Sequence, residues 1–327
     1  MNTLIFCARE RDTSPFQLWR LTFPDGELQQ ITSDLDEYKG VSVAGNKIVT
    51  VQTDRSWKIL ISTPETETPA EQIAFGKGFS YGISWANESL VHSTMTGDRL
   101  HIWRIDRNTG PARLTFEGDN YHPVLSSDGR FVVFSSKRLD GRVNIWRMNA
   151  KDGSGLQQLT FTDGNYYPSI SPDNQWVAYD NLLDSKATIW KVSLFGGQAV
   201  KVADGYRMPA FSPDGSFIAG RYHAASNTRD VAIFPVDGGQ AVQHVANIPV
   251  LEWQRVAWLD SRTFSYIESK NGVSNLWSRD VHTGTSKQLT FFDSDQIVAY
   301  AWSPDFKHVV CQRVTNATNV TIHSSER

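Results

Sequence analysis

The feature that most constrains the fold of this chain is an internal repeat of about 43 residues. One marker, an aromatic or apolar residue at a single strand position, occurs at Trp19, Leu60, Trp103, Trp146, Trp190, Phe234, Trp277 and, in degenerate form, Thr321, at intervals of 41 to 44 residues. A second marker, matching the first residue of a closing Leu-Thr pair, occurs at Ile31, Ile73, Leu114, Leu159, Val202, Val245 and Leu289, at intervals of 41 to 45 residues. Two markers with one period indicate the blade-sized units of a β-propeller.

The unit from Leu114 to Thr160 shows what each repeat contains. Four apolar runs, HPVLS, RFVVFSS, VNIWRMN and LQQLT, carry the β-branched and aromatic residues that favour strands. The breaks between them are Asp-Gly turns at Asp128-Gly129, Asp140-Gly141 and Asp152-Gly153. The same turn aspartate recurs at Asp173, Asp214 and Asp305, once per unit, so we assign it to turn formation and not to catalysis. Each unit is predicted to be a four-stranded antiparallel meander.

The whole chain is therefore predicted to be an all-β propeller of four-stranded antiparallel blades, as a single domain over residues 1–327. Eight repeat units can be counted, and eight blades are favoured because residues 3–22 match the repeat well. Seven blades remain an alternative, in which the strand at 27–32 would join the three carboxy-terminal strands. The marker tryptophans Trp103, Trp146, Trp190 and Trp277 are expected to be buried between neighbouring sheets.

Composition excludes several classes of partner. The net charge is −3 and no basic stripe is present, so nucleic acid is not an expected partner. No apolar run approaches the roughly 18 residues of a membrane span. The short apolar run in residues 1–8 is followed by charged residues, which favours a strand over a signal peptide. Cys7 and Cys311 are expected to be buried thiols, and whether they pair is left open.

The repeats resemble the TolB-like, WD-repeat-like propeller family over essentially the whole chain. Its signature, Trp/Phe-Ser-Pro-Asp-Gly before an apolar run, is matched at 211–215 and 302–305 and nearly matched at 125–129. Residues 253–323 further resemble the carboxy-terminal blades of propellers attached to bacterial membrane-anchored Ser/Thr kinases, through 272–277, 287–290 and 302–305. That resemblance implies a sensor module with an extracytoplasmic location. The chain has no kinase motif, so any kinase activity would lie in another segment.

Two features that resemble catalytic or metal sites are given structural explanations. Gly78 to Gly82 matches the G-x-S-x-G pattern around Ser80, but no helix is expected to follow it, so a glycine-rich connection is favoured over a nucleophile. The eight histidines show no metal-binding spacing. His92 and His101 are expected to lie on adjacent strands as a polar pair. We therefore expect no catalytic residue, no cofactor and no metal.

The best candidate site is formed by the connections that precede each innermost strand, because these connections surround one mouth of the central channel. They combine aromatic rings with polar tips, as ligand and partner sites do. The candidate residues are Tyr38, Tyr81, Tyr121, His122, Tyr166, Tyr167, Arg207, Trp253 and Gln296. Arg207 would be the orienting charge, suited to a carboxylate or phosphate. The alternative is that the aromatic rings pack between blades.

The predicted function is a non-catalytic ligand- or protein-binding propeller, as a sensor or interaction module of a bacterial signalling protein. The first alternative is a stand-alone TolB-like scaffold that binds other proteins. The second is a propeller enzyme, a lyase or hydrolase, acting at the central channel. One fold hosts all three functions, so the choice depends on the site.

Overall fold

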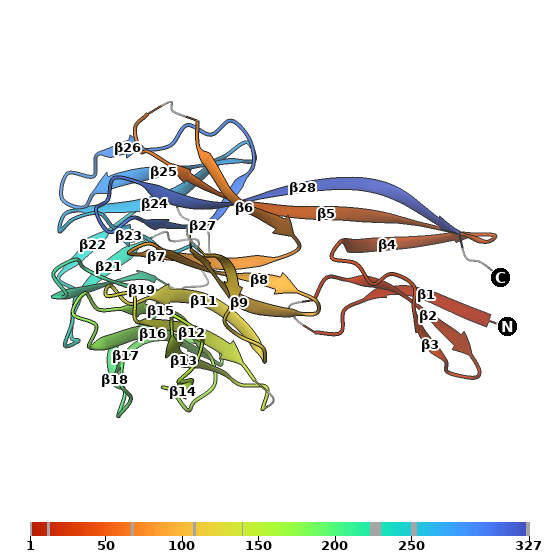
Figure 1. The fold of residues 1–327 in the computed structure, drawn as a ribbon, viewed down its shortest axis with the longest axis horizontal. Helices are drawn as coiled ribbons and strands as arrows, with labels where there is room; N and C mark the ends of the chain where they lie inside the picture. The colour runs from red at the N-terminus through yellow and green to blue at the C-terminus, as the bar shows by residue number, and fades with distance from the viewer. Residues whose placement is uncertain are drawn as a thin grey trace.

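The computed structural model describes residues 2–11, 14–66, 69–106, 109–138, 140–222, 230–249 and 254–324 (Figure 1). The described residues form strands and their connections, with no helix, and therefore no helix that could cross a membrane. They make seven antiparallel sheets: five of four strands, one of three and one of five. The predicted class, an all-β propeller of four-stranded antiparallel blades, is confirmed.

Five blades follow one another along the chain. Blade 1 contains β7 (Ser80–Ala86), β8 (Ser89–Thr96), β9 (Arg99–Asp106) and β10 (Gly110–Arg113). Blade 2 contains β11 (Asp119–Leu125), β12 (Phe131–Lys137), β13 (Val143–Asn149) and β14 (Gln157–Gln158). Blade 3 contains β15 (Asn165–Ile170), β16 (Trp176–Leu183), β17 (Lys186–Ser193) and β18 (Val200–Asp204). Blade 4 contains β19 (Tyr206–Phe211), β20 (Phe217–Tyr222), β21 (Val231–Pro235) and β22 (Gln243–Val245). Blade 5 contains β23 (Ala257–Trp258), β24 (Thr263–Lys270), β25 (Val273–Asp280) and β26 (Ser286–Gln288).

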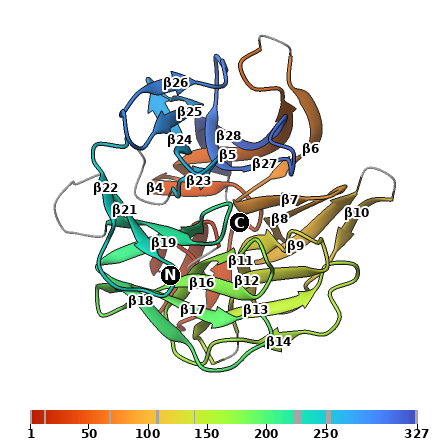
Figure 2. The ribbon, with the colours of Figure 1, turned by 90° about the vertical axis from the view of Figure 1, so that its left-hand side faces the viewer.

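Blade 6 combines strands from both ends of the chain. Its inner strands are β27 (Gln296–Trp302) and the first part of β28 (Val309–Ser324), and its outer strands are the last part of β5 (Lys47–Ser62) and β6 (Glu71–Lys77). The innermost strands then lie side by side from β27 through β7, β11, β15 and β19 to β23, and β25 packs against β27. The six blades therefore form a closed ring (Figure 2).

The remaining strands form an arm that projects from the ring (Figure 1). One of its sheets contains β1 (Asn2–Ala8), β2 (Gln17–Phe23) and β3 (Leu28–Gln30), and the other contains β4 (Glu37–Ala44) with residues 47–55 of β5 and 315–324 of β28. The two sheets enclose a small core of Leu18, Tyr38 and Ile48. The arm leaves the ring at the face where the innermost strands begin, since Gln296 at the start of β27 pairs with Val314.

The preference for eight blades is wrong, and the seven-blade alternative also fails. The second repeat unit, at about residues 33–74, and the last one were each counted as a blade, but they contribute two strands each to blade 6. Residues 3–22 match the repeat locally, yet their strands β1 and β2 lie in the arm, in the sheet β1-β2-β3. The cause is the length of β5 and β28, which pair without interruption from Val309↔Ser62 to Ser324↔Lys47. Whether residues 1–327 behave as a single domain stays a prediction.

The hydrophobic core lies between neighbouring blades. One cluster joins Ile102 of blade 1 to Phe134 of blade 2, and another joins Ile145 of blade 2 to Val177 of blade 3. The marker tryptophans were expected to be buried between neighbouring sheets, but they are only half-buried. The residue before each of them is completely buried instead, at Ile102, Ile145, Ile189 and Leu276. Since side chains alternate along a strand, the tryptophan faces the other side of its sheet. Trp146, Trp190 and Trp277 pack there against the edge of a cluster.

The two cysteines are free and lie in different parts of the fold. Cys7 packs at the edge of the arm core, and Cys311 is buried in blade 6. Burial raises the pKa of the Cys311 thiol to about 12, so it behaves as a small apolar side chain.

The two halves of the β5–β28 pair are predicted to differ in their effect on stability. Ile59 in blade 6 is 0 % exposed, whereas Ile322 in the arm is 62 % exposed. Ile59→Ala should lower the free energy of unfolding by about 2–5 kcal/mol, because it leaves a cavity in the core. Ile322→Ala, the same truncation at an exposed site, should change it by less than about 0.5 kcal/mol. Urea denaturation of both variants measures the difference, and equal losses would contradict the assignment of Ile59 to a closed blade.

Candidate functional site

A cavity of about 1030 Å³ occupies the centre of the ring and is lined by residues from all six blades. Its entrance on the arm side is formed where the innermost strands begin. Arg55 and Asn316, at the base of the arm, also line it, and the Arg55 side chain bonds the Asn316 amide oxygen at 3.0 Å and lies 4.2 Å above the Phe79 ring. The site therefore lies where the arm meets the ring.

β-Bulges distort the innermost strands just inside this entrance. The pairing register shifts by one residue between Ser80 and Ile83, between Tyr121 and Val124, between Tyr166 and Ser169, and between Arg207 and Ala210. In blades 2, 3 and 4 the bulge contains a proline, at Pro123, Pro168 and Pro209. Proline has no amide hydrogen to donate, so a bulge is one of the few places where a sheet accepts it. Bulges also redirect side chains, and here they redirect them into the channel.

One residue of each bulge adopts a positive φ. The values are 90° at Gly82, 49° at His122, 51° at Tyr167 and 56° at Met208. Blade 1 requires glycine there, since a Cβ at Gly82 would lie 2.9 Å from the His122 Cα. For a histidine or tyrosine this backbone conformation costs of the order of 1–3 kcal/mol. His122 and Tyr167 nevertheless occupy it, and both line the cavity.

Counting three residues back from the large apolar residue at the end of each innermost strand, which is Trp85, Leu125, Ile170, Phe211, Trp258 or Trp302, defines one layer of the channel. The layer contains Gly82, His122, Tyr167, Met208, Arg255 and Ala299. The His122 and Tyr167 rings stack with their centroids 4.0 Å apart. Met208 is buried away from the cavity, and glycine and alanine leave space on the other side. The channel interior thus presents two stacked rings and the Arg255 guanidinium.

Three arginines line the cavity: Arg55 lies at the entrance, and the other two, Arg207 and Arg255, have different electrostatic partners. The Arg207 Nε donates to the Asp180 Oδ2 at 2.8 Å, so the charge of Arg207 is balanced by a buried carboxylate. Burial raises the pKa of Asp180 to about 6 despite this pairing. The Arg255 Nη1 donates instead to the Pro168 carbonyl at 3.2 Å. Within the described part of the chain, no carboxylate lies within ion-pair distance of Arg255.

Burial and the neighbouring arginines keep His122 neutral. Loss of solvent lowers its pKa to about 3, and the positive charges of Arg255 and Arg207 act in the same direction. Its Nδ1 is buried and has no hydrogen-bond partner among the described residues. Burial also raises the pKa of Tyr167 to about 12, so this tyrosine stays protonated. At neutral pH the layer therefore carries one positive charge, that of Arg255, for which the described residues provide no carboxylate.

Most of the predicted mouth residues do meet at this channel. The cavity is lined by Tyr81, Tyr121, His122, Tyr166, Tyr167, Arg207 and Gln296. The predicted position of Tyr38 is wrong: it lies in the arm, where its hydroxyl donates to Asp34 at 2.7 Å. The strand that begins near Tyr38, β4, pairs with the arm part of β5 and is not an innermost blade strand. Trp253 lies outside the described residues. Ligand or partner binding by these residues stays a prediction.

Two residues of the site were missed in the sequence. Arg255 follows the connection that contains Trp253, and it is found only if blades are aligned on the last aromatic of the innermost strand, Trp258 in blade 5. Asp180 lies on a second strand and gives no sequence signal, because its role depends on contact with the next blade.

The other chemical candidates have structural partners. The Ser80 Oγ donates to the Ser93 carbonyl at 2.7 Å and accepts a bond from the Gln312 amide, and β7 continues from it as a strand. His101 bonds Arg113 at 2.8 Å, and the His92 ring packs against Trp57 with their centroids 5.2 Å apart, so the predicted histidine pair does not form. No cluster of three or more potential metal ligands occurs among the described residues.

Acid is predicted to destabilise the protein partly through His122. The folded-state pKa of about 3 lies below the reference 6.5, so the contribution of His122 to stability is present above pH 6.5 and is lost as pH falls towards 3. His122→Gln should reduce the loss of unfolding free energy between neutral and mildly acidic pH. His282→Gln, at an exposed histidine, is the matched control and should keep the wild-type pH dependence. Urea midpoints across this pH range measure both, and identical slopes for all three proteins would contradict a buried neutral His122.

Ser80 is predicted to be unreactive towards serine-directed probes. Its hydroxyl donates to a backbone carbonyl, and no histidine is among the partners described above. A fluorophosphonate probe should leave the protein unlabelled under conditions that label a serine hydrolase, as read by intact-mass spectrometry. Stoichiometric labelling that Ser80→Ala abolishes would contradict this prediction.

No protein-family model matches the chain, and no curated protein matches its sequence. Several solved structures do match its fold. The putative TolB from Agrobacterium tumefaciens is 16% identical, with 80% of this chain and 99% of that chain covered and a TM-score of 0.63. A chain of a nidogen/laminin complex is 12% identical, with 83% and 98% covered and a TM-score of 0.55. A puromycin-hydrolyzing peptidase from Mycobacterium tuberculosis is 14% identical, with 89% and 53% covered and a TM-score of 0.56. The likeness at these identities is one of fold: the chain is a β-propeller similar to TolB-like and other propeller proteins.

Proposed function

We propose that this protein is a non-catalytic binding module that takes a ligand into the channel through the entrance on the arm side. The observation that carries the proposal is the presence of His122 and Tyr167 at positive φ in the channel wall. Backbone strain of this kind occurs most often at binding and catalytic sites. Three tyrosines and one arginine from successive blades, Tyr81, Tyr121, Tyr166 and Arg207, complete an aromatic and polar wall. The cavity volume is that of sites for small organic molecules, about 300–1,000 Å³.

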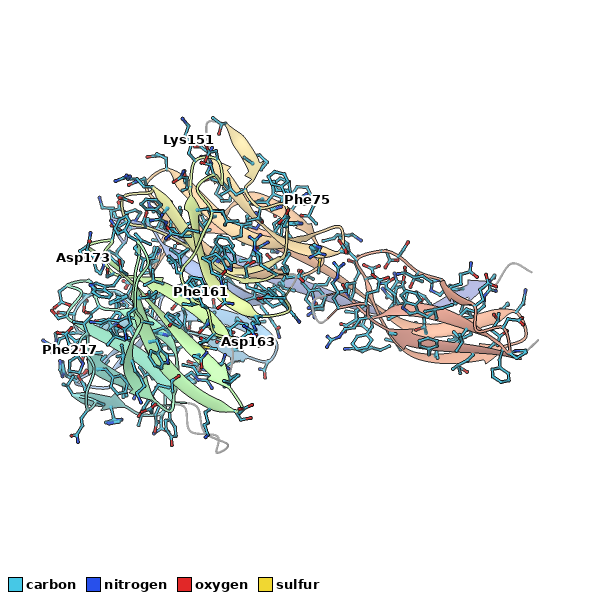
Figure 3. The ribbon with its side chains drawn as sticks, turned by 90° about the horizontal axis from the view of Figure 1, so that it is seen from below. Phe75, Lys151, Phe161, Asp163, Asp173 and Phe217 are labelled. Atoms are coloured by element: carbon cyan, nitrogen blue, oxygen red, sulfur yellow. The ribbon has the colours of Figure 1, made fainter. Side chains whose placement is uncertain are left out.

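A second candidate, a scaffold that binds other proteins, is favoured by phenylalanines on four successive blades of the ring. Each lies two residues after the second sequence marker, and they are 55–76 % exposed: Phe75, Phe116, Phe161 and Phe291. Figure 3 labels Phe75 and Phe161 on the ring body. Exposed aromatics at a repeated position are typical of interaction surfaces. The similar structures agree with this candidate, since one is a putative TolB and one is a protein complex.

The finer assignment, a sensor or interaction module of a bacterial signalling protein, is supported by the resemblance of residues 253–323 to kinase-attached propellers. The described part of that segment forms blade 5, the inner strands of blade 6 and the β28 part of the arm. In such a protein the propeller would lie outside the cytoplasm. An enzyme acting at the channel is the remaining candidate, and the peptidase among the similar structures is consistent with it. The partners found for Ser80, His92 and His101 favour binding over catalysis.

Loss of entrance tyrosines is predicted to weaken ligand binding without unfolding the protein. Uncharged aromatic fragments, indole and p-cresol, serve as probes, and saturation-transfer NMR detects their binding. Tyr81→Ala with Tyr166→Ala should weaken binding by about 2 kcal/mol or more, as for a hot spot. Tyr222→Ala, at a tyrosine of blade 4 that does not line the cavity, is the matched control and should bind as wild type. Circular dichroism confirms that each variant is folded. Unchanged binding by the double variant would overturn the proposed entrance.

A further inference from the structure

We propose that the channel contains an anion site centred on Arg255, which takes the carboxylate of a small ligand with a flat apolar body. The inference rests on the proposed function, because it names the class of ligand for the same channel. It differs from the sequence prediction, in which Arg207 was the orienting charge.

Arg207 and Arg255 differ in whether a carboxylate balances their charge. Arg207 is held by the Asp180 carboxylate at 2.8 Å and lies with its guanidinium carbon 5.6 Å from the Tyr167 ring centroid. Its charge is already balanced. Arg255 lines the same cavity, and the bond described for it goes to a neutral backbone carbonyl, that of Pro168. A bond to one carbonyl leaves most of the five guanidinium N–H donors for a ligand.

An unbalanced charge at the position of Arg255 lowers the stability of the folded protein. Burial lowers the pKa of Arg255, and the groups that act on it electrostatically are the neutral tyrosines Tyr300 and Tyr167. A buried charge without a partner destabilises a folded protein. A ligand anion would remove that cost and gain the parallel hydrogen bonds that a guanidinium offers to a carboxylate.

The aromatic rings in the layer of Arg255 indicate the chemistry of the uncharged part of the ligand. The stacked rings of His122 and Tyr167 belong to the same layer as Arg255 and present flat surfaces. Flat apolar groups stack on such rings. The neutral His122 also has a buried Nδ1 without a hydrogen-bond partner among the described residues, so it adds a polar contact but no charge. One unbalanced positive charge suits a monoanion such as a carboxylate. A phosphate monoester carries a charge of about −1.5 to −2 at neutral pH, so it fits this single charge less well.

The test uses a pair of probes that differ only in charge, indole-3-acetate and indole-3-acetamide. By isothermal titration calorimetry, wild-type protein should bind the carboxylate about tenfold or more tightly than the amide. Arg255→Gln should abolish this preference and bind both probes equally. Arg142→Gln, at an exposed arginine of blade 2, is the matched control and should keep the preference.

A second measurement does not depend on the probe. In low-salt buffer free of carboxylates, Arg255→Gln should melt at a higher temperature than wild type, because it removes the unbalanced charge. Indole-3-acetate should raise the melting temperature of wild type and leave that of Arg255→Gln unchanged. A lower melting temperature for Arg255→Gln would show that the arginine is already balanced, and it would overturn the inference.

The remaining outcomes separate the inference from the proposed function. Equal binding of acid and amide by wild type, or a preference that survives in Arg255→Gln, overturns the anion site. If uncharged indole still binds in an entrance-dependent way, the proposed function stands. Inorganic phosphate and acetate are compared as competitors of indole-3-acetate. If phosphate displaces it as effectively as acetate, the site accepts anions in general, and the assignment to carboxylates is overturned.

Discussion

The pairing of β5 with β28 is the interaction on which the rest of the structure depends. The two strands come from opposite ends of the chain and stay in register from Val309↔Ser62 to Ser324↔Lys47. The blade half of this ladder completes the sixth blade, so every blade has a neighbour on both sides and the ring has no open edge. The other half extends beyond the ring and becomes the centre of the arm. One half of the β5–β28 ladder therefore closes the ring, and the other half forms the arm.

Ring closure is also what creates the candidate binding site. His122, Tyr167, Arg207 and Arg255 come from four successive blades, and they line one cavity because the ring fixes their distance from a common axis. Arg55, at the point where the β5–β28 ladder leaves the ring, brings the arm into the entrance. A ligand that enters from this side passes the base of the arm before it reaches Arg255. The arm is thus placed to contact whatever approaches the channel.

The period of the sequence was sufficient to predict the blades, their third strands and most of the entrance. It was not sufficient to predict how many blades close the ring. Trp19 has the same local pattern as Trp146 yet lies in the arm, because strand propensity and turn residues do not specify which strands pair over 250 residues of separation. The Asp180–Arg207 pair was hidden for the same reason, since it joins two blades. Arg255 was within reach of the sequence, because it directly follows the connection that contains Trp253.

The bulges show that the channel chemistry is more than a consequence of folding. The same backbone position is filled by Gly82 in blade 1, where a positive φ costs little, and by Ala299 in blade 6, which does not adopt a positive φ. The ring can therefore close without a strained side chain at this position. Blades 2, 3 and 4 instead place His122, Tyr167 and Met208 there, at a cost of the order of 1–3 kcal/mol each. His122 and Tyr167, the two of these that line the cavity, stack their rings in the layer that also holds Arg255. Strain that the fold does not require, located beside the Arg255 guanidinium, is what a site selected for binding would show.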